Sequence, residues 1–184
     1  FCPVCWPAGS EPMSHEPPFV TPCPDLARVK LLCCDIDGVL TDGGLYYADD
    51  GTRFARFHVL DGMGLKRVQA AGVKLAFISQ SRTRYIETRA RDLGVDFCHT
   101  GIEDKSVTLG AILNDLGLRF EDAAHIADDV NDLSLLRAVG MPVTVPDGRP
   151  EVKEVCRFQT RARGGNGAVR ELCEAILASQ SAAG

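Results

Sequence analysis

Two aspartates separated by a single residue follow an apolar run near the start of the chain. The stretch reads "LLCCDIDGVLTDGG" over residues 31–44, with Asp35 and Asp37 directly after the apolar residues. In an extended chain, residues two apart point to the same side, so both carboxylates should face one pocket. Neighbouring carboxylates repel each other unless a cation or a proton lies between them. Mg²⁺ is the expected cation because it is hard and prefers oxygen ligands.

A second acidic cluster follows another apolar run. The segment "HIADDVND" contains Asp128, Asp129 and Asp132. A lone aspartate at the end of a strand is more commonly a helix cap. Two separate acidic clusters, each at the end of an expected strand, instead favour one shared site. We therefore expect the second cluster to complete the cation site begun by Asp35 and Asp37.

Lys105 and Ser79 are further candidates for chemistry. Lys105 opens an expected helix, where the helix dipole disfavours a positive charge. A negatively charged partner is therefore expected, either a pair of carboxylates or a bound phosphate. Ser79 ends an expected strand, where its hydroxyl could hold a phosphate oxygen, although a serine there is more commonly a cap or a turn residue.

The elements that must position these residues alternate along the chain. Continuous apolar strands that alternate with helices predict an α/β fold, with a Rossmann-like parallel sheet flanked by helices. Ligands of such sheets bind beyond the carboxyl ends of the strands, where the polar clusters fall. The expected strands are residues 29–35, 73–79, 95–101, 123–128 and 141–145; the expected helices are 61–72, 83–94, 105–117, 131–140 and 168–179; a β-hairpin is expected over 45–58.

Composition limits the classes of protein to consider. The chain has 184 residues, is 45% hydrophobic and carries a net charge of -5, which suits one globular domain. The negative charge argues against a dominant nucleic-acid surface, and no apolar run is long enough to span a bilayer. The first residues lack the basic and then apolar pattern of a signal peptide. We expect a cytoplasmic protein that binds neither nucleic acid nor membrane.

The first 27 residues differ from the remainder. They are rich in proline and show little periodicity, so we expect a loosely ordered tail over 1–27 and a single domain over 28–184. Cys2 and Cys5 have the spacing of half a zinc site, but no second pair exists, so no zinc site is expected. Cys33 and Cys34 lie in an apolar run and are expected to be small buried hydrophobes.

The polar clusters, taken together, resemble the haloacid dehalogenase superfamily of aspartyl-phosphate phosphatases. "DIDGVLTDG" is similar to the first motif of the superfamily, and Ser79, Lys105 and "ADDVND" follow in the order of the second, third and fourth motifs. The similarity extends from about residue 29 to residue 177. Within the superfamily, "LDGMGLKRVQAAGVKLAFIS", "DKSVTLGAILNDLGL" and "GGNGAVRELCEAIL" most resemble the 3-deoxy-D-manno-octulosonate 8-phosphate phosphatases.

The resemblance implies a role for each motif residue. Asp35 would be the nucleophile that takes the phosphoryl group, and Asp37 would protonate the leaving alcohol and then activate water. The side chains of Asp35 and Asp128 and the backbone carbonyl of Asp37 would hold Mg²⁺, while Lys105 and Ser79 would hold phosphoryl oxygens. The implied activity is the magnesium-dependent hydrolysis of 3-deoxy-D-manno-octulosonate 8-phosphate through an aspartyl phosphate.

The expected sugar contacts depart from the family pattern. Gln80 and Ser81 stand where relatives usually have Gly-Arg, Leu60 replaces a common arginine, and Asn166 stands where arginine is common. These changes alter the groups that would hold the carboxylate of an acidic sugar. A 2-keto-3-deoxy-nononate 9-phosphate therefore stays open as an alternative substrate. The residues predicted to bind substrate are Ser79, Gln80, Arg82, Asp61, Lys105 and Arg170.

The chain leaves no room for a cap domain. Residues 44–74 can hold only a hairpin and a helix, and residues 79–105 only a helix and a short strand. Phosphoryl transfer benefits from exclusion of bulk water. The resemblance implies that the hairpin and the "RGGNGAVRE" segment cover sites of neighbouring subunits, so we expect a homotetramer. A non-catalytic oligomerisation domain, a phosphotransferase and a mutase are the competing interpretations. The intact motif residues favour catalysis, and the lack of a cap argues against a transferase or mutase.

Overall fold

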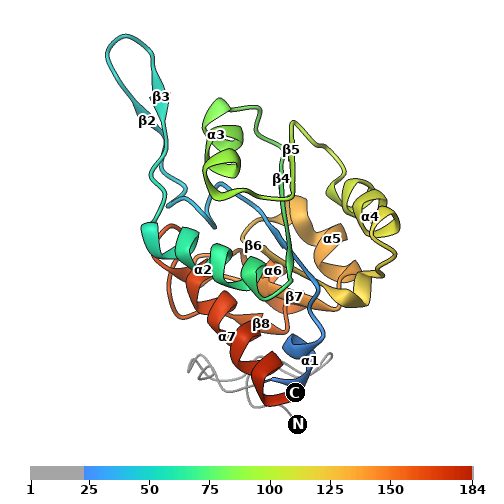
Figure 1. The fold of residues 1–184 in the computed structure, drawn as a ribbon. Helices are drawn as coiled ribbons and strands as arrows, with labels where there is room; N and C mark the ends of the chain where they lie inside the picture. Colours follow the sequence, from blue (N-terminus) through green and yellow to red (C-terminus); the bar gives the residue numbers. More distant parts are fainter. Residues whose placement is uncertain (1–22, 184) are drawn as a thin grey trace.

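A six-stranded parallel sheet forms the centre of the computed structural model, which describes residues 23–183 (Figure 1). The strand order is β5-β4-β1-β6-β7-β8, and every neighbouring pair is parallel. The expected α/β architecture with a Rossmann-like parallel sheet is confirmed. The strands of this sheet are β1 (Leu31–Cys34), β4 (Lys74–Ser79), β5 (Phe97–Thr100), β6 (Ala123–Ala127), β7 (Met141–Thr144) and β8 (Phe158–Gln159).

Helices cover both faces of the sheet. Successive residues of β1 point to opposite faces, as the pleat requires. Leu32 and Cys34 join one buried cluster with residues of α1, α2, α3 and α7, whereas Leu31 and Cys33 join another with residues of α4 and α5. The helices are α1 (Pro24–Ala27), α2 (Val59–Ala70), α3 (Arg84–Leu93), α4 (Lys105–Asp115), α5 (Leu133–Ala138), α6 (Pro150–Val155) and α7 (Ala168–Ala183), with short 3₁₀ turns η1 (Phe120–Asp122) and η2 (Val130–Asp132).

Glycines end three of the helices, as their positions in the sequence predict. Gly72, Gly94 and Gly117 follow α2, α3 and α4, with φ angles of 95°, 70° and 64°. This left-handed conformation costs glycine little because it has no Cβ. Each helix therefore stops where the chain must turn into the next strand, which fixes the strand ends that carry the polar clusters.

The predicted N-terminal tail is too long. Residues 1–22, including the Cys2–Cys5 pair, lie outside the described residues. Residues 23–27, by contrast, belong to the domain: Cys23 and Leu26 are fully buried, and the Cys23 N–H donates to Ser179 Oγ in α7 at 2.8 Å. Apolar burial against α7 outweighs the turn-forming tendency of the prolines, so the prediction of a loose tail is wrong for residues 23–27.

The predicted β-hairpin extends away from the body of the molecule (Figure 1). Its strands, β2 (Tyr46–Tyr47) and β3 (Arg53–Phe54), are antiparallel, and the rings of Tyr46 and Phe54 stack with centroids 5.5 Å apart. Leu45 is 62% exposed and Phe54 is 52% exposed. Between β1 and β4 the chain forms only this hairpin and α2, so no cap domain is inserted there.

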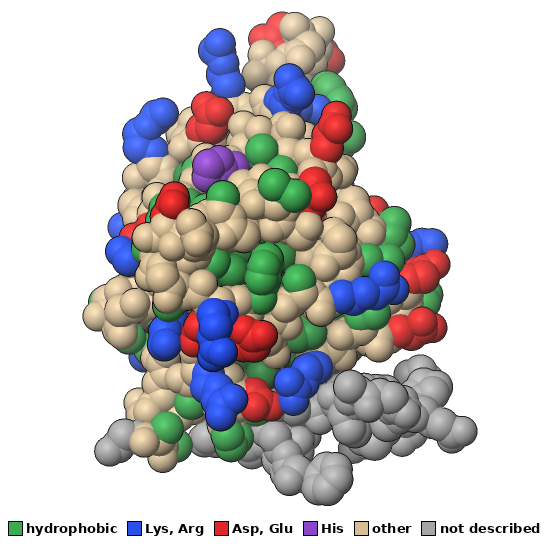
Figure 2. Space-filling view, turned by 90° about the vertical axis from the view of Figure 1, so that its right-hand side faces the viewer, with side chains coloured by type: hydrophobic (Ala, Val, Ile, Leu, Met, Phe, Trp, Pro, Cys, Tyr) green, Lys and Arg blue, Asp and Glu red, His purple; other side chains and the backbone are tan. Residues whose placement is uncertain are grey.

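Charges of both signs are interspersed on the face of the molecule seen in Figure 2. Lysine and arginine side chains lie among aspartates and glutamates, with apolar groups between them, rather than in one basic field. Within residues 23–183, each helix is too short or too polar to cross a bilayer.

Candidate active site

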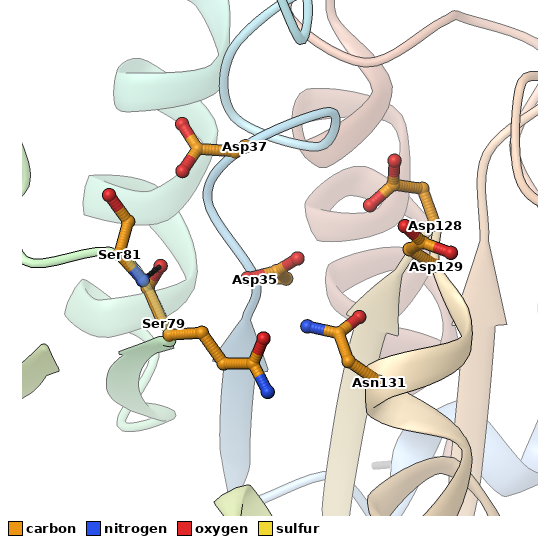
Figure 3. Close-up of a pocket in the computed structure, with 8 residues that line it drawn as sticks. Asp35, Asp37, Ser79, Ser81, Asp128, Asp129 and Asn131 are labelled. Carbon is orange, nitrogen blue, oxygen red and sulfur yellow. Dashed lines mark hydrogen bonds between the residues drawn. The ribbon is translucent and has the colours of Figure 1, made fainter. Parts of the chain in front are cut away.

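A polar pocket opens at the carboxyl ends of β1, β4 and β6, the region that the sequence predicts for a ligand. Its volume is about 200 Å³. Figure 3 shows Asp35 at its centre, between Ser79 on one side and Asp128 and Asn131 on the other. The lining residues are Asp35, Asp37, Ser79, Gln80, Ser81, Asp128, Asp129 and Asn131. Residues far apart in the sequence thus meet at one edge of the sheet because parallel strands end there together.

A chain of buried charged groups lies directly behind Asp35. The ammonium of Lys105 donates to Asp35 Oδ1 at 2.7 Å and to Asp132 Oδ2 at 2.8 Å. The other oxygen of Asp132 lies 2.7 Å from Nε2 of His125, whose Nδ1 lies 3.2 Å from the Cys33 carbonyl oxygen. Lys105 is only 1% exposed. The expected negative partner of Lys105 is therefore a pair of carboxylates.

Burial sets the protonation of the two acidic clusters. It raises the pKa of Asp35 to about 6, although Lys105 opposes the shift. Burial together with the negative charges of Asp35 and Asp129 raises the pKa of Asp128 to about 7. The ionised forms are therefore disfavoured until a positive charge approaches. A cation between Asp35 and Asp128 would restore both carboxylates.

The groups around Asp128 suit a hard cation. Within residues 23–183, Oδ1 of Asp128 is buried and accepts no hydrogen bond. Such an oxygen is costly to bury unless a cation or a water coordinates it. No three acidic, histidine or cysteine side chains among the described residues converge as a complete ligand set. A cation bound here would take carboxylate oxygens from Asp35 and Asp128, and a third protein ligand would have to come from another group, such as a backbone carbonyl.

The Asp37 side chain projects from a tight loop after β1. Thr41 secures this loop: its hydroxyl accepts from the Gly38 N–H at 3.3 Å and donates to the Ile36 carbonyl at 3.4 Å. The hydroxyl of Tyr85, in the first turn of α3, donates to Asp37 Oδ1 at 2.8 Å. Burial raises the pKa of Tyr85, so this phenol stays protonated and remains a donor.

Ser79 and Gln80 line the side of the pocket next to α3. Ser79 is 2% exposed, and its Oγ accepts from the Ser81 N–H at 3.1 Å. This bond makes Ser79 a turn residue. The Ser79 hydroxyl is the acceptor in it, so its own proton can still be donated to a ligand. Gln80 is exposed at the pocket rim. The turn role predicted for Ser79 is therefore confirmed, and its contact with a phosphate oxygen stays a prediction.

Three of the predicted substrate contacts lie outside the pocket. Asp61 is 1% exposed and accepts the N–H groups of Gly167 and Arg170 at 3.3 and 2.8 Å, so it caps the start of α7. The Arg170 guanidinium pairs with Glu174. Arg82 is exposed and lies beside Gly101. Asp61 thus has a structural role, because buried backbone donors at a helix start need an acceptor, and its contact with substrate stays a prediction.

Sequence reasoning missed several pocket neighbours. Ser81 and Asn131 line the pocket. The sequence analysis noted Ser81 only because it departs from the family pattern, and Asn131 only as the first residue of an expected helix. Tyr85 and His125 gave no signal, because their contacts join separate elements: the Tyr85–Asp37 bond spans 48 positions. Only the folded chain brings those groups together.

The glycine-rich loop before α7 packs against the loop that carries Asp37. A Cβ at Gly164 would overlap the carbonyl oxygen of Gly38, and one at Gly165 would overlap the backbone of Asp42. Arg56, which follows the hairpin, donates to the Gly165 carbonyl at 3.2 Å and to Asn166 Oδ1 at 3.1 Å. The loop therefore joins the hairpin to the loop that carries Asp37.

Comparison with known proteins identifies the family of the chain. The sequence profile of the haloacid dehalogenase-like hydrolases matches residues 82–172. A 3-deoxy-D-manno-octulosonate 8-phosphate phosphatase of Yersinia pestis is 36% identical over 154 residues, which span 84% of this chain and 82% of the relative. The chain belongs to the 3-deoxy-D-manno-octulosonate 8-phosphate phosphatase family. As a member of this family of haloacid dehalogenase-like hydrolases, the protein is a phosphoric monoester hydrolase.

Solved structures of the phosphatase family share its fold. The Moraxella catarrhalis phosphatase, described as a complex with a magnesium ion, a phosphate ion and a KDO molecule, has a TM-score of 0.83 at 36% identity, over 85% of this chain and 90% of that one. The cobalt-bound Haemophilus influenzae phosphatase has a TM-score of 0.81 at 33% identity, over 85% and 92% of the two chains. Divalent metals are thus present in both relatives.

Proposed function

We propose that this phosphatase is magnesium-dependent and hydrolyses a phosphorylated acidic sugar, with 3-deoxy-D-manno-octulosonate 8-phosphate as the favoured substrate. One observation carries the proposal: Asp35 bonds Lys105 at 2.7 Å and shares a pocket with Asp128, whose buried Oδ1 accepts no hydrogen bond within the described residues. A nucleophile, a fixed cation and an oxygen poised for a metal are the parts that phosphoryl transfer needs.

The reaction takes place in two steps. Asp35 attacks phosphorus, and the bond to the sugar oxygen breaks as Asp37 gives that oxygen a proton. The resulting aspartyl phosphate is attacked by a water, which passes a proton to Asp37 and releases inorganic phosphate and Asp35. Dividing one displacement into two easier ones is the benefit of a covalent nucleophile. Lys105 keeps Asp35 oriented, and the Ser79 hydroxyl donates to a phosphoryl oxygen.

The metal site consists of Asp35 and Asp128, with the Asp37 carbonyl as the third ligand. When bound, Mg²⁺ neutralises the negative charge that the phosphoryl group and the two carboxylates bring together. The raised pKa values of Asp35, about 6, and Asp128, about 7, support this assignment, because both groups gain from a nearby positive charge. The magnesium of the Moraxella catarrhalis relative supports the choice of metal.

The substrate assignment depends on the relatives. Their names specify the octulosonate 8-phosphate, and the polar lining of the pocket of about 200 Å³ suits a phosphate group. The second candidate is a 2-keto-3-deoxy-nononate 9-phosphate, which is favoured by Leu60 in place of an arginine on the adjoining α2.

We also propose a homotetramer. Leu45, Tyr47 and Phe54 expose apolar side chains on a projecting hairpin, and the pocket has no cap domain to exclude water. A hairpin from one subunit that lies over the pocket of another would bury these apolar side chains and exclude water from that pocket. The hairpin and the glycine-rich loop are the pieces available for this contact.

Phosphate release from a panel of sugar phosphates tests the function. We expect the octulosonate 8-phosphate to give the highest kcat/KM. We also expect activity to vanish after chelation and to return when Mg²⁺ is added. Asp35→Asn should fold normally and lose at least about a thousandfold in kcat, because an amide is a poor nucleophile. A variant that keeps a tenth of the activity, or full activity after exhaustive chelation, contradicts the mechanism or the metal respectively. A preference for the nononate 9-phosphate selects the second substrate.

A further inference from the structure

A phenol lies directly against the proposed acid–base residue. Tyr85, the second residue of α3, donates its hydroxyl to Asp37 Oδ1 at 2.8 Å. Asp37 lines the pocket. Figure 3 shows its carboxyl group turned away from Asp128. The bond therefore occupies one carboxyl oxygen and leaves Oδ2 to exchange protons with a substrate.

The ring of Tyr85 is fixed by its neighbours. It meets the ring of Phe57 edge-on at 6.0 Å between centroids, and the Arg89 guanidinium lies over the Phe57 ring at 5.5 Å. Phe57 in turn pairs with Thr41, the residue that secures the Asp37 loop. The position of the Tyr85 ring is thus set by residues that contact the Asp37 loop. The Tyr85 hydroxyl is therefore held in a fixed position relative to Asp37.

We propose that Tyr85 is a positioning residue that aims Asp37 at the leaving oxygen, so that the enzyme can use substrates with poor, alkyl leaving groups. The inference rests on the proposed acid–base role of Asp37. Tyr85 keeps its own proton throughout. Asp37 gives the Oδ2 proton to the sugar oxygen as the P–O bond breaks, and then takes one proton from the water that attacks the aspartyl phosphate.

Leaving-group dependence separates positioning from packing. A sugar phosphate releases an alkoxide, which must be protonated as it leaves. 4-Nitrophenyl phosphate releases a stable phenolate, which needs no proton. Loss of the Tyr85 hydroxyl should therefore lower kcat/KM for the sugar ester and spare kcat/KM for the aryl ester. The ratio kcat/KM is the proper measure because it excludes the later hydrolysis of the aspartyl phosphate, which both esters share. A general loss of structure would slow both esters alike.

The experiment compares three variants on the two esters in the intact protein with Mg²⁺. Tyr85→Phe keeps the ring and removes only the hydroxyl. We expect kcat/KM for the octulosonate 8-phosphate to fall about fivefold to tenfold, with less than about a twofold change in kcat/KM for 4-nitrophenyl phosphate. Phe57→Leu keeps the hydroxyl but removes the ring that holds Tyr85 in place, so it should show a smaller loss with the same selectivity for the sugar ester.

Asp37→Ala supplies the reference, because it removes the acid itself and should show the same selective loss in kcat/KM to a larger extent. Its kcat should fall for both esters, since both pass through the same aspartyl phosphate. If the loss in kcat/KM is selective in Asp37→Ala but equal for both esters, or absent, in Tyr85→Phe, the inference about Tyr85 is wrong and the proposed function stands. If the loss in kcat/KM of Asp37→Ala is not selective, the role of Asp37 as the acid is wrong, and the inference about Tyr85 falls with it.

Discussion

The positive charges near Asp35 offset some of the surrounding carboxylates but not that of Asp128. Lys105 and His125 are the cations that face Asp35 and Asp132. Burial lowers the pKa of His125, but its interactions with Cys33 and Asp132 outweigh this effect and raise the pKa to about 10, so the ring is charged at neutral pH. Two cations thus offset two carboxylates, and Asp128 is the acidic group at the pocket whose buried oxygen remains without a partner among residues 23–183.

This imbalance predicts a pH-dependent stability in the chelated protein. The pKa of Asp128, about 7, lies above the unfolded value of about 3.9, so the folded state holds a proton that the unfolded state has lost. The free energy of unfolding should therefore fall as pH rises from about 4 to about 7, by on the order of 2 kcal/mol. Mg²⁺ should reverse this loss at pH 7.5 and have little effect at pH 5.

Denaturant titrations at pH 5 and pH 7.5, with chelator and with Mg²⁺, measure this effect. Asp128→Asn removes the titrating group and is the matched control, because the amide keeps the shape of the side chain. Its unfolding free energy should show a smaller pH slope and a smaller gain from Mg²⁺. Equal slopes in both proteins would show that Asp128 is not the group responsible.

At the residue scale, the sequence predicted the groups and not all of their contacts. Spacing of two residues and strand ends were enough to place Asp35, Asp37 and Asp128 in one pocket. The helix-dipole argument gave Lys105 a negative partner, which the structure identifies as Asp35 and Asp132. Asp61 could not be placed, because a carboxylate that caps a helix and one that binds a sugar look alike in sequence.

At the scale of elements, the loop before α7 packs on the loop that carries Asp37 and so holds it in place. Gly164 and Gly165 let the two backbones touch, and Arg56 connects the loop to the hairpin and to Asp42. The loop therefore has a role within its own subunit, beside the covering role that the sequence predicts. The α7 helix that follows buries Val169, Leu172 and other apolar residues, so it is part of the core.

Gly164→Ala should reveal this contact. A Cβ at Gly164 would overlap the Gly38 carbonyl, so one of the two loops must shift. We expect a loss of about 1–3 kcal/mol in unfolding free energy and at least a tenfold loss in kcat, because Gly38 adjoins Asp37. The matched control is Gly110→Ala in α4, where the new methyl would make ordinary contact with Phe120. Thermal melts and steady-state kinetics on both variants decide the matter.

The control should be neutral or slightly stabilising, since alanine favours a helix more than glycine does. Unchanged kcat in Gly164→Ala would show that the loop tolerates displacement.

The longer helices and strands were predictable from the sequence. The helix ends at glycines and the continuous apolar strands were predicted correctly. The short α6 and β8, with six and two residues, were not, because their formation depends on packing against the sheet more than on a local pattern.

At the scale of the whole molecule, the pocket has no cap domain above it among residues 23–183. The sheet and its helices form a closed core, whereas the hairpin projects apolar side chains away from it (Figure 1). A two-stranded hairpin is marginally stable without further packing. The sequence predicted the missing cap from the spacing of the motifs, because the residues between them suffice only for a hairpin and a helix. Exposed Leu45, Tyr47 and Phe54 are the surface through which a second copy would bind.

Charge placed on the hairpin tests this assembly. The wild type should be a tetramer by light scattering at micromolar concentration, and Leu45→Glu with Phe54→Glu should dissociate it, because both side chains are more than half exposed in the single chain and would be buried in the contact. The separated subunits should keep most of their secondary structure and lose at least about tenfold in kcat/KM for the sugar phosphate, since the pocket then stays open to water. Val107→Glu places the same charge on a residue that is 69% exposed on α4, and should change neither mass nor rate. A wild type that is monomeric and fully active at this concentration would overturn the assembly, and a double variant that dissociates without loss of rate would limit the hairpin to a structural contact.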